Sequence, residues 1–228
     1  MKYLKVLLFG IFAGLAIGLG SFTFTIVSAY FPSWEGQVFA SALFSIGLIL
    51  VCVLGLQLFT GKVGVVFDDS EKLKENAINL PIMLLGNAIG AFGLGLLCYL
   101  IFTKNVPELA SRIATVSAAK TDSKFVLLEG IFCGALVYIA VYFFKNNQNW
   151  GMKIIGIITA VTLFVLARFQ HCIANMFYFA MDFDHMNINM LWNVLIVILT
   201  NSVGALLVRC IVHLTALIAT KKEPEDKE

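Results

Sequence analysis

In the stretch Gln57-Leu58-Phe59-Thr60-Gly61-Lys62-Val63-Gly64, a long apolar run of the chain turns polar. Two glycines and a threonine at the end of such a run favour unwinding of a helix. A second stretch, Ala167-Arg168-Phe169-Gln170-His171-Cys172-Ile173-Ala174-Asn175, places an Arg, a Gln, a His and an Asn within another apolar run. A central charge in a membrane span costs roughly 2.5–3.5 kcal/mol on insertion scales, and unwound backbone must line a cavity. The two stretches therefore predict a polar site between broken helices.

The chain has too few charged residues to cover a soluble domain. Of its 228 residues, 60% are apolar and 13% are charged, whereas soluble domains carry about a quarter charged residues. A helix needs about 20 apolar residues to cross the hydrocarbon core. We expect six transmembrane helices, at residues 4–30, 38–59, 77–102, 125–144, 152–181 and 189–219. The predicted fold is an all-α polytopic membrane protein with one domain, residues 1–220, and a charged cytoplasmic tail, residues 221–228.

The distribution of Lys and Arg sets the expected orientation, because cytoplasmic loops are enriched in both. With the N-terminus inside, the cytoplasmic positions are Lys2, Lys5, Lys62, Lys72, Lys74, Lys145, Lys153, Lys221, Lys222 and Lys227. The outer positions, all between the third and fourth segments, are Lys104, Arg112, Lys120 and Lys124. We therefore expect a multi-pass protein of the plasma (inner) membrane, in contact with lipid, with both termini in the cytoplasm. A net charge of +2 without a basic arm gives no indication of nucleic-acid binding.

Three landmarks recur in the same order along the chain. Gly10-Ile-Phe-Ala-Gly14 returns 120 residues later as Gly130-Ile-Phe-Cys-Gly134. Asn79-x7-Asn87-x2-Gly90-Ala91 returns 114 residues later as Asn193-x7-Asn201-x2-Gly204-Ala205, and the glutamines of the two polar stretches are 113 residues apart. The pattern predicts two repeats, at about 1–110 and 120–220. Because each repeat holds three spans, the second is expected to be inverted, an arrangement typical of transport folds.

These residues carry a resemblance to a known family. Leu58-Phe59-Thr60-Gly61, the stretch Phe169–Met176 and the Asn landmarks resemble the formate/nitrite transporter family over nearly the whole chain. The resemblance implies a homopentamer of aquaporin-like protomers, with broken second and fifth helices and one anion pore per subunit. It also implies two apolar constrictions around a central Thr/His pair, with a Lys in the outer vestibule.

Carried onto this sequence, the resemblance assigns roles to particular residues. The central pair is Thr60 and His171, and the vestibule lysine is Lys120. The constriction residues are Phe44, Leu48, Leu58, Phe59 and Phe164. The polar residues expected along the pore are Gln57, Gln170, Asn175 and Asn193. The family usually has acids before the Leu-Phe-Thr and before the His, where this chain has Gln57 and Gln170, and a small residue is common where it has Arg168.

The function expected from these features is passage of small monovalent anions of weak acids, with formate or nitrite as the default. In this mechanism outer cations concentrate the anion, Thr60 and His171 bind it, and His171 donates a hydrogen bond or a proton. A neutral acid then crosses the remaining apolar ring more easily than an ion does. Hydrosulfide is an alternative cargo, and an aquaporin-like channel for neutral solutes is an alternative function.

Enzyme chemistry is not expected. No paired carboxylates, zinc-ligand set or Ser/His/Asp spacing accompanies His171. The cluster Asp182-x-Asp184-His185 lacks a fourth metal ligand, so we expect a solvated loop there, and neither a metal nor a cofactor.

Overall fold

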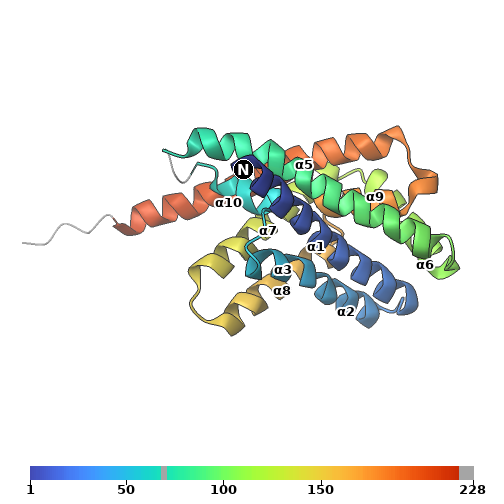
Figure 1. Ribbon diagram of the computed structural model, residues 1–228. Helices are drawn as coiled ribbons and strands as arrows, with labels where there is room; N and C mark the ends of the chain where they lie inside the picture. The colour runs from blue at the N-terminus through green and yellow to red at the C-terminus, as the bar shows by residue number, and fades with distance from the viewer. Residues whose placement is uncertain (68–70, 221–228) are drawn as a thin grey trace, which may run out of the picture.

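Long apolar helices form most of the structure. The computed structural model describes residues 1–67 and 71–220, so the predicted tail at 221–228 lies outside the described residues. Every regular element in this part of the chain is helical (Figure 1). In chain order the elements are α1 (Lys2–Tyr30), α2 (Trp34–Phe44), α3 (Ile46–Val53), α4 (Phe59–Lys62), η1 (Val63–Val65), α5 (Leu73–Cys98), η2 (Tyr99–Thr103), α6 (Pro107–Thr121), α7 (Val126–Asn146), α8 (Trp150–Leu166), α9 (Cys172–Met181), η3 (Phe183–His185) and α10 (Ile188–Thr220).

Five helices among the described residues are long and apolar enough to cross a membrane. They are Lys2–Tyr30, Trp34–Val53, Leu73–Thr103, Val126–Asn146 and Ile188–Ala219. Each overlaps one of the predicted segments. The fifth predicted segment, 152–181, instead contains two shorter helices, α8 and α9, with a non-helical link between them.

The connection between the third and fourth predicted segments is not a simple loop. It contains α6, which begins with Pro107 at its first turn and has Glu108 beside it. Proline and an acidic residue are both favourable at a helix N-terminus. One face of α6 buries Leu109, Ile113 and Val116, which holds the helix against the bundle. The apolar stripe is short and interrupted by charges, so hydropathy alone did not reveal it.

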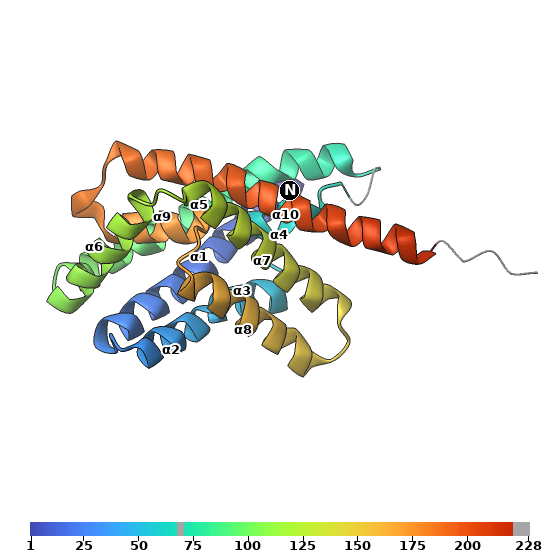
Figure 2. The ribbon, with the colours of Figure 1, turned by 180° about the vertical axis from the view of Figure 1, so that it is seen from behind.

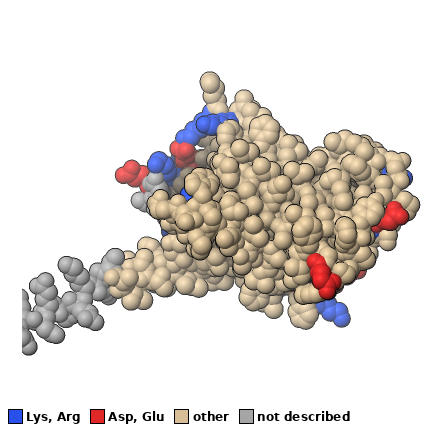
Figure 3. All heavy atoms as spheres, turned by 90° about the horizontal axis from the view of Figure 1, so that it is seen from below, with Lys and Arg blue, Asp and Glu red and all other residues tan. Residues whose placement is uncertain are grey.

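The surface of the molecule matches a membrane environment. Charged side chains gather toward opposite ends, and the surface between them is largely uncharged (Figure 3). Large apolar side chains such as Phe12, Leu97, Phe132, Leu199 and Leu207 are exposed on this middle region. Seen from behind, α10 runs the full length of the bundle and projects past it at the end where the N-terminus lies (Figure 2). The chain is a multi-pass membrane protein.

Two helix pairs approach each other at glycines. α5 packs against α1, and a Cβ on Gly90 would overlap the carbonyl oxygen of Ile11. α10 packs against α7, and a Cβ on Gly204 would overlap the carbonyl oxygen of Ile131. Small residues allow such backbone contact in membranes. Gly90 and Gly204 belong to the recurring landmarks, so the repeat found in the sequence coincides with equivalent helix contacts.

Gly204→Ala is expected to lower the apparent melting temperature of the purified protein in detergent. The added methyl meets backbone that cannot move aside, and overpacking of this kind costs about 1–3 kcal/mol. Gly93→Ala is the matched control in α5, because nothing lies within 4 Å of a Cβ at that position. Equal melting temperatures for the two variants would contradict this account of the helix contact.

Candidate functional site

Both polar stretches leave the helical conformation inside the protein. The chain is non-helical at residues 54–58, between α3 and α4, and at 167–171, between α8 and α9. Gly55 has φ +64°, and Arg168, 113 residues later, has φ +60°. A left-handed conformation costs a non-glycine residue about 1–2 kcal/mol. The first break lies earlier than Gly61 and Gly64 suggested, because those glycines are within α4 and η1 and make room for neighbouring side chains.

One asparagine side chain satisfies the backbone of the first break. Asn87 Oδ1 accepts a hydrogen bond from the backbone N–H of Phe59 at 2.8 Å. Its Nδ2 donates to the carbonyl oxygens of Gly10 at 2.9 Å and Gln57 at 2.8 Å. Asn87 is completely buried. Water is scarce at such a depth, so backbone groups released by the break need protein partners, and Asn87 supplies them.

The second break has an equivalent asparagine. Asn201 Oδ1 accepts from the backbone N–H of Cys172 at 3.0 Å, and Nδ2 donates to the carbonyl oxygens of Gly130 and Gln170, each at 2.8 Å. These partners are the counterparts of Phe59, Gly10 and Gln57 in the recurring landmarks. We call the two groups the asparagine clamps. They fix where α4 and α9 begin.

Thr60 and His171 join the two breaks. Thr60 Oγ1 and His171 Nε2 are 3.1 Å apart, and both residues are buried. His171 is also the N-cap of α9, because its Nδ1 accepts the backbone N–H of Ala174 at 3.2 Å. An acceptor Nδ1 in a neutral ring places the proton on Nε2. His171 therefore donates to the Thr60 oxygen, which leaves the Thr60 hydroxyl hydrogen free to donate elsewhere.

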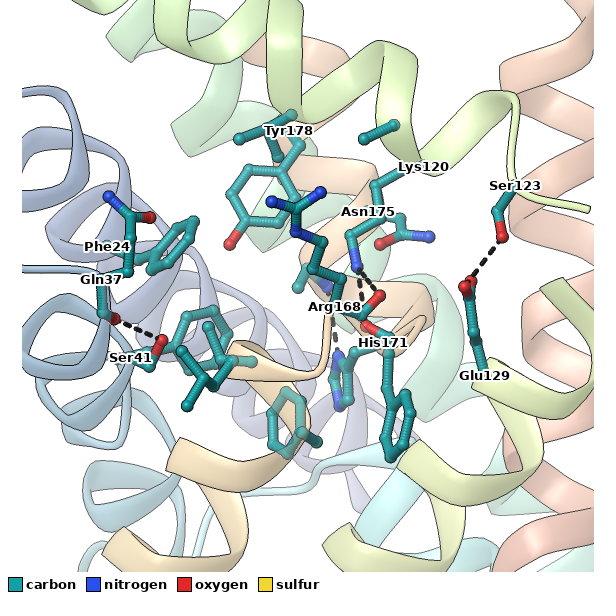
Figure 4. A pocket seen from close by; sticks show the side chains of 18 of the residues that line it. Phe24, Gln37, Ser41, Lys120, Ser123, Glu129, Arg168, His171, Asn175 and Tyr178 are labelled. Carbon is teal, nitrogen blue, oxygen red and sulfur yellow. Dashed lines mark hydrogen bonds between the residues drawn. The ribbon is translucent and has the colours of Figure 1, made fainter. Parts of the chain in front are cut away.

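Aromatic rings enclose His171 on the side of a cavity. The Phe164 ring stacks on the imidazole with centroids 5.9 Å apart, and Phe44 meets Phe164 edge to face at 5.7 Å. All three residues line a cavity of about 430 Å³ (Figure 4). The other expected constriction residues, Leu48, Leu58 and Phe59, do not line this cavity and are 2%, 2% and 6% exposed.

Lys120 lies at the same cavity but is not a free cation. Its Nζ donates to the carbonyl oxygens of Arg168 at 2.9 Å and Phe169 at 2.7 Å, so it braces the second break (Figure 4). Arg112 also lines the cavity, and its guanidinium donates to Ser28 Oγ at 2.7 Å and Gln37 Oε1 at 2.8 Å.

Arg168 lines the cavity as well and is exposed, and its guanidinium has no hydrogen bond or ion pair among the described residues. Arg168 lies in the second break, where its backbone is left-handed. The sequence indicated Lys120 only by resemblance. Arg112 was expected among the outer cations, but Arg168 at the same cavity was not predicted, because its position along the chain does not reveal it.

A polar network lies at the cavity wall, where Asn175 lines the cavity. Asn175 Nδ2 donates to Gln170 Oε1 at 2.7 Å and to Asn193 Oδ1 at 2.8 Å. Gln170 Nε2 and Asn193 Nδ2 both donate to the carbonyl oxygen of Lys120, at 3.1 and 2.9 Å. Three of the predicted polar residues are thus hydrogen-bonded together. Gln57 is not among them and lines a separate cavity.

Glu129 is a member of this network that the sequence did not reveal. Its carboxylate accepts from Gln170 Nε2 at 3.0 Å. It also accepts from Ser123 Oγ at 2.8 Å (Figure 4). Gln170 stands where the resemblance implies that the family usually has an acid, and a carboxylate from α7 lies against it. A glutamate near the start of a predicted span reads as an interfacial residue, which is why it was missed.

The Asp182-x-Asp184-His185 cluster lies apart from the cavity. Asp182 Oδ1 and His185 Nδ1 are 2.7 Å apart, and this contact raises the pKa of the exposed imidazole. Among the described residues no three His, Cys, Asp or Glu side chains are grouped to hold a metal ion.

Known proteins resemble this chain over most of its length. Residues 1–215 match the sequence model of the formate/nitrite transporter family. The chain is 35% identical to the uncharacterised transporter YrhG of Bacillus subtilis over 184 residues, 76% of this chain and 69% of that protein. Identity to the formate channel FocB of Escherichia coli is 28%, over 76% of this chain and 64% of that protein. Identity to the nitrite transporter NirC of Escherichia coli is 31%, over 75% and 65%. The matches span about two thirds of these relatives.

Solved structures of channels also resemble this chain. A pentameric formate channel with formate bound superposes with a TM-score of 0.84 and 26% identity, covering 96% of this chain and 98% of that one. An FNT family ion channel superposes with a TM-score of 0.73 at 22% identity, and shares the fold.

Asn87→Ala and Asn201→Ala are each expected to destabilise the protein strongly. Each leaves buried backbone groups without partners, and an unsatisfied buried group costs about 1–3 kcal/mol. Apparent melting temperatures in detergent measure the loss. Asn146→Ala is the control, because Asn146 caps the exposed end of α7 through a single bond to Tyr142. If the buried asparagines tolerated alanine as well as Asn146 does, the clamps would not support the breaks.

Proposed function

Because the chain belongs to the formate/nitrite transporter family, we propose that it is a membrane channel or transporter for small monovalent anions of weak acids. Formate or nitrite is the default cargo. The observation that carries the proposal is the hydrogen bond between Thr60 and His171 at 3.1 Å, which joins the two helix breaks beside a cavity lined by cations. The names of the relatives, formate channel and nitrite transporter, support the class of cargo.

The proposed architecture has six crossings in two inverted repeats, residues about 1–110 and 120–220, within a single domain. α8 and α9 together form one broken crossing, and α3 and α4 belong to another. The matching partners of the two asparagine clamps support this arrangement. Assembly as a homopentamer is supported by the pentameric formate channel of similar structure. The Lys and Arg distribution supports an inner-membrane location with both termini in the cytoplasm.

The proposed path begins at the 430 Å³ cavity. Lys120, Arg112 and Arg168 give this cavity a positive potential, which raises the local concentration of anions. The Arg168 guanidinium has no partner among the described residues, so it makes the first contact. Lys120 contributes its charge while it braces the second break. The anion then meets the Thr60 hydroxyl and His171. The aromatic pair Phe44 and Phe164, with Leu48, Leu58 and Phe59, forms the apolar barrier that an ion crosses least easily.

The geometry favours hydrogen-bond donation by a neutral His171 over a full proton transfer. If Nε2 gives its proton to the anion, Nδ1 must take one up, because an imidazole anion is too costly at this depth. Nδ1 already accepts the N–H of Ala174. Protonating it removes the N-cap of α9, a loss of about 1 kcal/mol. Proton coupling is thus possible only with a local opening of the α9 N-terminus.

A panel of solutes in proteoliposomes tests the proposed function. We expect flux of formate or nitrite, measured at pH 5 and pH 8 with protein-free liposomes as the control. Hydrosulfide flux without formate or nitrite flux would identify hydrosulfide, the alternative cargo, as the transported anion. Water flux without any anion flux would contradict the proposal in favour of a neutral-solute channel.

His171→Asn separates the two roles of the imidazole. Asparagine is a good N-cap, so the variant keeps the start of α9 while it removes the titratable ring. If His171 relays protons, formate flux should lose its pH dependence between pH 5 and 8 in this variant. His171→Ala, which also removes the cap, serves as the comparison for structural damage. A wild-type pH profile in His171→Asn would rule out the relay.

A further inference from the structure

A second cavity lies at the opposite end of the bundle. It has a volume of about 440 Å³ and lies beside the first turns of α1, where Lys5 lines it, whereas Phe24 of the same helix lines the first cavity. At 1.5 Å per residue these two positions are about 28 Å apart along α1. Its polar and charged lining residues are Lys2, Lys5, Gln57, Lys62, Glu75, Asn76 and Asn79.

Three of these residues are the repeat counterparts of the hydrogen-bonded network at the first cavity. Gln57 and Lys62 precede Gln170 and Asn175 by 113 residues, and Asn79 precedes Asn193 by 114. The second-half trio is held together by bonds of 2.7 and 2.8 Å and is closed by the carbonyl of Lys120 on α6. The first-half trio lies at an open cavity instead.

The side chains of the first-half trio lack partners in the part of the chain that the structure describes. Among the described residues, Gln57, Lys62 and Asn79 make no side-chain hydrogen bond or ion pair, and the buried Oδ1 of Asn79 is unsatisfied. Lys62 is half-buried. An unpaired ammonium and two unpaired amides at one cavity are costly unless something binds them. In Asn79 the unsatisfied buried atom is Oδ1, and the NH2 group is not buried in this way, so all three side chains can act as donors.

We propose that Gln57, Lys62 and Asn79 form a second binding site for a small monovalent anion, at the opposite end of the pore from Lys120. The inference rests on the proposed function and adds a site to it. The ammonium of Lys62 supplies the charge, and the amides supply donors that suit the two oxygens of a carboxylate or nitrite. A cavity of 440 Å³ also leaves room for several waters, so the anion keeps part of its hydration shell.

The other charges around the cavity do not replace Lys62. Lys2 is paired with Glu75. Lys5 lies over the Phe9 ring with its Nζ 5.5 Å from the centroid, and its side chain is exposed. Lys62 ends α4, two residues after Thr60, and is therefore the cation closest to Thr60 in sequence, whereas Lys2 and Lys5 lie at the start of α1. An anion at Lys62 is positioned for exchange with the Thr60–His171 pair.

Bromide binding tests the site without requiring transport. Crystals of the full chain soaked in sodium bromide should show anomalous density beside Lys62 Nζ. The density should be absent in Lys62→Asn, which has the residue found at the counterpart position 175, and should persist in Lys62→Arg. Lys74→Asn is the control, because Lys74 is an exposed lysine near the start of α5 and its loss changes the net charge equally. No bromide at Lys62 in the wild-type protein, or bromide unaffected by Lys62→Asn, would overturn the proposal.

Formate uptake gives a second readout. With substrate added on the Lys62 side, Lys62→Asn should raise the half-saturating formate concentration by about tenfold, as expected for loss of a charge-assisted hydrogen bond. Lys62→Arg and Lys74→Asn should stay near the wild-type value. Bromide at Lys62 in a protein that passes no anion would support the site and contradict the proposed function. Formate flux that is identical in wild type and Lys62→Asn would support the function and contradict the site.

Discussion

Backbone groups that leave a helix inside a membrane must find partners in the protein, and the rest of this structure depends on how that requirement is met. Asn87 and Asn201 each bind one backbone N–H and two carbonyl oxygens across a break. They tie each break to the helix that crosses beside it, α1 or α7. Because the Oδ1 and the Nδ2 of each side chain both form hydrogen bonds, the start of α4 and the start of α9 are fixed. Thr60 and His171 occupy those starts, so the clamps determine where the two side chains meet.

The sequence contained much of this arrangement. Paired Asn and Gly landmarks predicted the repeat, and the polar stretches predicted the breaks, because such residues are costly in a span without a structural use. The break before α4 was misplaced, since Gly61 and Gly64 were read as unwinding residues when their role is close packing. α6 and the contact of Glu129 with Gln170 were missed, because they depend on which faces meet in three dimensions. Periodicity and hydropathy carry no information of that kind.

The two ends of the proposed pore differ although the halves correspond. On one side α6 covers the trio Gln170, Asn175 and Asn193, and Lys120 becomes a brace for the break. On the other side the counterpart trio stays open and contains Lys62 in place of an asparagine. The proposed pore thus has two chemically distinct entrances. Such a difference gives an anion unequal affinities at the two ends without any change in the central pair.

In the proposed function, Thr60 and His171 act as one unit on the permeating anion. A double-mutant cycle on formate flux in proteoliposomes tests it most directly, with Thr60→Val, His171→Asn and the double variant. The account predicts strong coupling, with the double variant no slower than the slower single variant, because either substitution already breaks the shared hydrogen bond. Flux losses that multiply in the double variant would show that the two residues act independently, and would contradict the account.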